Sequence, residues 1–60
     1  MTWKITRPNR SPFMASDQEL IDYAIKRSVK ALNAKQVFRG TTVEEARAWL
    51  HLHGTVTEKL

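Results

Sequence analysis

The chain has 60 residues, which limits it to one small domain, because a chain of this length buries only about 60% of its unfolded surface. It contains no cysteine, so neither a disulfide nor a thiolate zinc site supports the fold, and a partner or a second copy is the remaining support. No apolar run approaches the roughly 18 residues that span a bilayer, and no signal-peptide core follows Met1. We therefore expect a cytoplasmic protein without membrane contact.

The net charge of +4 is concentrated near the N-terminus. Residues 1–15 contain Lys4, Arg7 and Arg10 and no acid, whereas residues 36–60 balance three bases against three acids. A pI near 10 is typical of nucleic-acid-binding proteins. The three basic side chains of the N-terminal segment are therefore candidate phosphate contacts.

Residues 1–15 are expected to form a basic, extended arm that packs on the remainder of the chain. Two prolines within it disfavour helix at the residues that precede them. Residues 3–6 alternate apolar and polar side chains as a short strand does, but a strand of this length needs a partner strand. The side chains of Trp3, Ile5 and Phe13 are costly to leave in water, so at least one of them should dock the arm on the helices that follow.

A first helix is predicted over about residues 17–35. Ser16 and Glu19 have the spacing of a capping box, in which each side chain accepts a hydrogen bond from the other residue's backbone N–H. Acids gather at the start of this segment and bases toward its end, which complements the helix dipole. Lys35 falls back into the apolar arc, and this position marks the expected end of the helix.

The two faces of this helix differ in character. Seven apolar side chains fall within a half-turn arc that should be buried, with Ser28 the only polar residue near its middle: Leu20, Ile21, Ala24, Ile25, Val29, Ala31 and Leu32. The opposite arc carries the basic side chains of Lys26, Arg27 and Lys30. This stripe is a second set of candidate phosphate contacts, although a solvated helix face accounts for it equally well.

A second helix is predicted over about residues 43–53. Thr42 and Glu45 repeat the capping-box spacing, and Gly54 can end the helix as a left-handed cap. Before this helix, Gly40 is free to take a positive φ in the connection. The two capped segments therefore predict a helical hairpin.

The fold class expected from these elements is all-α. Residues 16–54 form the two-helix hairpin, and the extended arm of residues 1–15 packs on it. Residues 55–60 form a short tail of coil or fraying strand. A chain with nineteen core-capable side chains, its 25 apolar residues less six alanines, does not supply both a rigid core and a deep pocket.

No pattern of catalytic or metal-binding residues stands out. Catalysis needs a nucleophile or a base held by a second group, and the sequence offers no such pair. His51 and His53 lie two positions apart, so on a helix they point about 200° apart and do not share an ion. We therefore expect no enzyme, no metal, no cofactor and no small-molecule substrate.

Residues 40–46, Gly-Thr-Thr-Val-Glu-Glu-Ala, resemble the turn and second-helix start of the ribbon-helix-helix DNA-binding proteins. The resemblance implies a dimer in which the N-terminal strands of two chains pair and place Thr2, Lys4 and Thr6 in the major groove. The chain departs from that family in the nine or ten residues, two prolines among them, between its strand and its first helix. Its first helix is also too long for the family.

A non-enzymatic protein-interaction module is the function that we expect foremost, with the DNA-binding dimer as the alternative. Two helices do not hide all the apolar side chains of this chain, so a protein partner or self-association should cover the surplus. Aromatic residues dominate interface energetics, and the candidate anchors are Trp3, Phe13, Phe38, Trp49 and Leu52. Alternatively, these side chains form the core of the monomer. We favour this alternative for Trp49 but not for Leu52.

In overall character the chain resembles the short early accessory proteins of temperate, lambda-like phages. The resemblance extends from the Met1-Thr-Trp-Lys start to the capped hairpin that ends at Gly54, and no defining motif carries it. It implies a regulatory protein of the bacterial cytoplasm that binds a host protein. It transfers no site residue to this chain.

Overall fold

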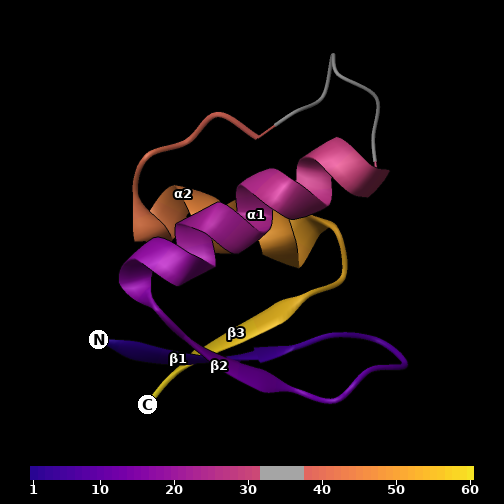
Figure 1. Ribbon diagram of the computed structural model, residues 1–60, viewed down its shortest axis with the longest axis vertical. Helices are drawn as coiled ribbons and strands as arrows, with labels where there is room; N and C mark the ends of the chain where they lie inside the picture. Colours follow the sequence, from indigo (N-terminus) through magenta and orange to yellow (C-terminus); the bar gives the residue numbers. More distant parts are fainter. Residues whose placement is uncertain (32–37) are drawn as a thin grey trace.

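The computed structural model describes residues 1–31 and 38–60, in which three strands and two helices form a layered fold (Figure 1). In chain order the elements are β1 (Thr2–Thr6), β2 (Phe13–Ser16), α1 (Asp17–Ala31), α2 (Val43–Leu52) and β3 (Val56–Lys59). The all-α prediction is therefore wrong, and the fold is α+β. Both the N-terminal arm and the C-terminal tail contribute strands to one sheet.

The sheet is antiparallel, and β1 is its central strand, in the order β2-β1-β3. On one side of β1, Trp3 lies opposite Ala15, and on the other side Ile5 lies opposite Thr57. The first and last strands are far apart in the sequence, yet the two ends of the chain lie side by side (Figure 1). The strand expected at residues 3–6 thus has two partner strands, both from its own chain.

This position of β1 excludes the ribbon that the ribbon-helix-helix resemblance implied. Both edges of β1 already pair within the chain, so this strand offers no edge to a second molecule. Thr2 and Thr6 are exposed on the sheet face that lies away from the helices, and Lys4 alternates onto the same face. The fold therefore does not have the ribbon-helix-helix arrangement.

Both helices cover the other face of the sheet (Figure 1). The side chains of β1 alternate across the sheet, so Trp3 and Ile5 point toward the helices and are buried there. They form one core with residues of both helices, of β2 and of the segment before α2: Ala15, Leu20, Ala24, Phe38, Ala46 and Leu50. The hydrophobic effect of this single small core holds the sheet and the helices together.

Both predicted capping boxes are confirmed. At the start of α1, the Ser16 N–H donates to Glu19 Oε1 at 2.8 Å, and the Glu19 N–H donates to Ser16 Oγ at 3.3 Å. At the start of α2, Thr42 and Glu45 make the same reciprocal pair. The left-handed cap is also confirmed, because Gly54 has φ 85°. These local signals place three of the four helix ends.

The predicted end of the first helix lies outside the described residues. The structure follows α1 to Ala31, and the predicted continuation over residues 32–35, which includes Leu32 and Lys35, is not described. The second helix ends at Leu52, with His53 as its C-cap, one residue earlier than predicted.

Phe38, the first described residue after this gap, is anchored in the core by a buried serine. The Phe38 N–H donates to Ser28 Oγ at 2.8 Å, and the same hydroxyl donates to the Ile25 carbonyl at 2.7 Å. The Phe38 ring also explains Gly40, since a Cβ at that position would lie 2.3 Å from Phe38 Cζ. Gly40 therefore allows close packing and, contrary to our expectation, does not adopt a positive φ.

Glu45 supports α2 through its charge. Its Oε1 accepts from Thr42 Oγ1 at 3.0 Å and from the Thr41 N–H at 3.2 Å. The Thr42 hydroxyl, followed by the Thr41 N–H, lowers the pKa of the Glu45 carboxyl below its usual value of 4.5. Because the folded pKa is depressed, the ionised carboxylate stabilises the fold above pH 4.5, and this contribution is lost as the pH falls through the lowered pKa.

Glu45→Gln is therefore expected to lower the melting temperature at neutral pH and to have much less effect well below pH 4.5. Thermal unfolding followed by circular dichroism at both pH values measures the difference. Glu44→Gln is the matched control, because it removes the same charge from the same helical turn. An equal loss for both variants at neutral pH would show that the carboxylate hydrogen bonds of Glu45 contribute nothing.

Candidate functional site

An open hollow of about 650 Å³ lies between the loop that joins β1 to β2 and the outer side of α1. We call it the basic groove, and nine residues line it: Arg7, Pro8, Arg10, Tyr23, Ile25, Lys26, Arg27, Val29 and Lys30. Five of these side chains are cationic, and no carboxylate of the described residues is among them. The groove thus gathers half of the ten lysines and arginines of the chain.

The loop between β1 and β2 forms one wall of the groove, the loop wall. The position of this loop follows from the register of the β1–β2 hairpin. Ile5 pairs with Phe13, so the seven residues between them must turn the chain outside the ladder. Asn9, with φ 58°, takes the left-handed conformation that asparagine tolerates better than most residues. The loop projects on the same side of the molecule as the C-terminal half of α1 (Figure 1).

Arg7 is held in place within this loop wall. Its Nη2 donates to the Ser11 carbonyl at 2.8 Å, and its Cζ lies 4.7 Å from the centre of the Phe13 ring. A guanidinium over an aromatic face is favourable and keeps its full charge. The arginine is therefore oriented before any ligand arrives.

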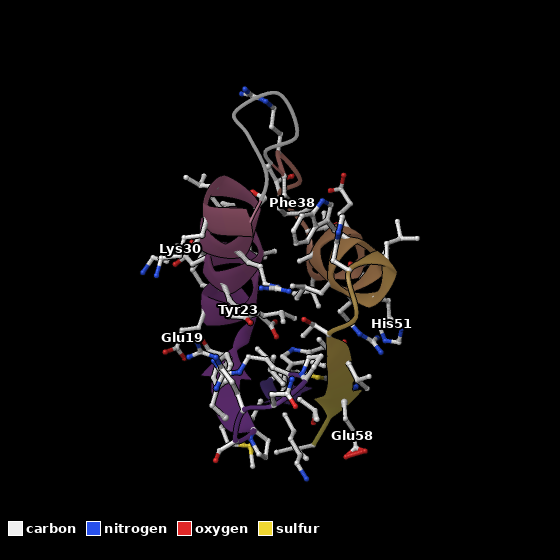
Figure 2. All side chains as sticks on the ribbon, turned by 90° about the vertical axis from the view of Figure 1, so that its right-hand side faces the viewer. Glu19, Tyr23, Lys30, Phe38, His51 and Glu58 are labelled. Atoms are coloured by element: carbon white, nitrogen blue, oxygen red, sulfur yellow. The ribbon has the colours of Figure 1, made fainter. Side chains whose placement is uncertain are left out.

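Helix α1 forms the other wall of the groove, and an aromatic contact ties this helix to the sheet. The rings of Tyr23 and Phe13 meet edge to face, with centroids 5.2 Å apart and planes at 68°. Lys26 and Lys30 are exposed, and Arg27 is half-buried. Figure 2 shows Lys30 on the side of α1 that faces away from α2. The contact between the two rings ties α1 to the start of β2, directly after the loop.

None of the acids of α1 lines the groove. Hydrogen bonds from the Ser16 backbone, and then from its hydroxyl, lower the pKa of Glu19 and keep it ionised at the helix start. Asp22 Oδ1 accepts from Gln18 Nε2 at 3.1 Å. By contrast, the buried Nε atoms of Arg7 and Arg27 have no hydrogen-bond partner within the described residues. The positive potential of the groove is therefore not neutralised by carboxylates among its lining residues.

Five of the six predicted phosphate contacts meet in this groove. Arg7 and Arg10 come from the arm, and Lys26, Arg27 and Lys30 come from the helix stripe, which the sequence presented as separate features. Lys4 is the exception, because it lies on the open sheet face between Met14 and Glu58. The hairpin loop accounts for this outcome, since it brings the end of the arm back to α1.

The five predicted protein-binding anchors do not gather on one surface. Trp3 and Phe38 are buried in the core, and Phe13 and Trp49 are half-buried against it. The Trp3 indole N–H donates to Asp17 Oδ1 at 2.7 Å, and Arg47 Cζ lies 4.6 Å from the Trp3 ring centre. Leu52 alone among the five is exposed, at 83% of its surface.

Four residues that line the groove were not predicted as site residues: Pro8 in the loop, and Tyr23, Ile25 and Val29 on the helix. Ile25 and Val29 were assigned to the buried arc of the helix, yet they are 36% and 58% exposed. The arc was too wide for a helix that packs along one side, and these two residues lie at its edge. The sequence does carry a signal for Tyr23, because an aromatic ring among basic side chains at helical spacing is typical of nucleic-acid binding.

The groove has the chemistry of an anion-binding surface.

Within residues 1–31 and 38–60, no group of three His, Asp or Glu side chains is arranged to hold a metal ion. Neither helix of this described part is long and apolar enough to cross a membrane. No protein-family model, no curated protein and no solved structure matches the chain.

Proposed function

We propose that the protein is a non-enzymatic, cytoplasmic binding protein whose basic groove binds the phosphates of a nucleic acid. The observation that carries this proposal is the convergence of five cationic side chains, from two separate elements, on one concave surface whose described lining residues include no acid. Arginine and lysine are the residues that contact phosphate in nucleic-acid complexes. The cytoplasmic location and a regulatory role are what the resemblance to phage accessory proteins implies.

The strength of such binding follows from counterion release. The logarithm of the association constant falls linearly with the logarithm of the salt concentration. Each phosphate contact steepens this slope by about 0.7 for a single strand and by about 0.9 for a duplex. The five cations of the groove therefore give a slope of at most about −3.5 or −4.5, respectively. This is the behaviour of a weak, largely sequence-independent binder that depends on low to moderate salt.

Fluorescence anisotropy of a labelled oligonucleotide, titrated with the protein at several salt concentrations, tests the proposal. We expect saturable binding. The logarithm of the association constant should fall linearly with the logarithm of the salt concentration, with a slope within these limits. Absence of binding at low salt, or binding that salt does not weaken, would contradict it.

A protein-binding function is the second candidate, and the exposure of Leu52 favours it. This leucine lies at the end of α2 and is 83% exposed, so a partner or a second copy gains apolar burial there without any change in the core. The half-buried ring of Trp49 lies on the same helix. Both functions fit a small adaptor with one basic and one apolar contact surface.

Leu52→Asp is expected to leave the helical circular dichroism and the melting temperature nearly unchanged, because exposed positions contribute within about 0.5 kcal/mol. Self-association or partner capture should be lost, as judged by solution mass at several concentrations. Leu50→Asp is the contrasting control, since that side chain is fully buried and its replacement should unfold the chain. Unfolding by Leu52→Asp would place Leu52 in the core instead.

A further inference from the structure

The basic groove is not uniformly polar. Ile25 and Val29 are two of the exposed large apolar side chains of the described residues, and both line the groove together with Tyr23. Phosphates need only charge and hydrogen-bond donors, so an apolar lining contributes nothing to a ligand that presents phosphates alone. A ligand that also presents flat apolar faces uses both components of this surface.

Tyr23 has the properties of a stacking platform. Its ring is oriented by the edge-to-face contact with Phe13, and the Phe13 ring in turn carries the Arg7 guanidinium. This row of three side chains places an aromatic ring and a fixed positive charge at one end of the groove. Nucleobases stack on such rings whatever their sequence, while nearby arginines and lysines hold the backbone.

The concave shape discriminates between single and double strands. A duplex keeps its bases stacked inside and is read by a helix or a β-ribbon that protrudes into its major groove. Here the apolar side chains lie in a hollow of about 650 Å³ between a loop and a helix, where paired bases do not reach them. Unpaired bases can turn out of their strand into such a hollow.

We propose that the basic groove binds a short single-stranded segment of nucleic acid, with one base on Tyr23, another against Val29, and phosphates on the five cations. The inference rests on the proposed function and narrows it to one ligand class. The same chemistry applies to single-stranded DNA and to single-stranded RNA. Binding to a duplex uses the cations alone and is therefore weaker.

Competition against a labelled oligothymidylate, with unlabelled oligothymidylate, oligouridylate and a duplex of the same length, tests this ligand class. We expect at least about 10-fold tighter binding of the single strands than of the duplex, as one lost base stack predicts. The two single-stranded competitors show whether DNA or RNA is preferred. Dextran sulfate, a polyanion without bases, should compete no better than the duplex.

Substitutions in the groove separate the stacking from the charge. Tyr23→Leu is expected to weaken single-strand binding about 5-fold or more and to leave duplex binding and the salt slope unchanged, whereas Tyr23→Phe should retain both. Because Tyr23 is half-buried, Val29→Ser serves as a second variant at a position that is 58% exposed. It should also reduce the preference for single strands without affecting the fold.

The outcomes distinguish the two proposals. Equal or tighter binding of the duplex, or of dextran sulfate, would overturn the single-strand inference and leave phosphate binding standing. An unchanged single-strand preference in folded Tyr23→Leu and Val29→Ser proteins would also overturn it. No binding to any nucleic acid at low salt would overturn the proposed function itself.

Discussion

Replacing Arg10, Lys26 and Lys30 together by glutamine is expected to weaken oligonucleotide binding roughly 100-fold at about 0.1 M salt. These three cations line the groove and are exposed, so their removal leaves the core unchanged. Each lost phosphate contact removes about 0.7 of a logarithmic unit of affinity at that salt concentration. The salt slope should become shallower by about 2, which anisotropy titrations measure directly.

The matched control replaces Lys4, Arg39 and Lys59 by glutamine. This variant loses the same three charges, but none of its positions lines the basic groove. If the groove is the binding site, the control should retain nearly the full affinity and the full salt slope. Equal losses in the two variants would show that binding follows net charge and has no defined site.

Ile5→Ala is expected to cost about 2–5 kcal/mol in the free energy of unfolding. Ile5 is 0% exposed and occupies the central strand, with Phe13 opposite it on one side and Thr57 on the other. Stabilities of 0.05–0.15 kcal/mol per residue imply a total of roughly 3–9 kcal/mol for this chain. The substitution should therefore leave the protein largely unfolded or close to it.

Urea unfolding followed by circular dichroism measures this loss. Val56→Ala is the matched control, because it removes a β-branched side chain that is 52% exposed in the same sheet, and it should change stability by about 0.5 kcal/mol or less. A mild effect of Ile5→Ala would mean that the N-terminal segment is an accessory arm, as the all-α prediction held, and not the centre of the fold.

The parts of the fold that depend on neighbouring residues were predictable from the sequence. The serine and glutamate at the start of α1, and the threonine and glutamate at the start of α2, satisfy orphan backbone groups within one turn, so their spacing alone identifies them. Gly54 ends α2 for an equally local reason, its left-handed φ. The sheet, by contrast, depends on pairing between strands that lie far apart in the sequence, and no short segment shows which strand it pairs with.

The strands β2 and β3 illustrate this difference. Residues 56–59 form β3 because they pair with β1 at the opposite end of the chain, and nothing in their own sequence reports that pairing. For β2 a signal was present: two prolines and an asparagine, which are typical loop residues, lie between the alternating residues 2–6 and the apolar run of residues 13–15. We interpreted the prolines as keeping the arm extended, whereas they lie in the loop that turns it back.

The candidate site was predictable residue by residue but not as a site. Charge counting identified the cations of the arm and of the helix, and the spacing along the sequence gave no reason to join them. The hairpin loop joins them in space, and the same loop brings Tyr23 and Phe13 into contact. Lys4 shows the converse, since it is close to Arg7 in sequence but points from the open face of the sheet.

The most direct test of the central claim, that the groove between the β1–β2 loop and α1 binds nucleic acid, is a titration of the amide resonances of isotope-labelled protein with an unlabelled oligothymidylate. The structure predicts progressive shifts confined to residues 7–10 and 23–30, with the amides of Met14, Val56 and Leu52 unmoved. Shifts centred on Leu52 or on the open sheet face, with those two segments unmoved, would contradict it.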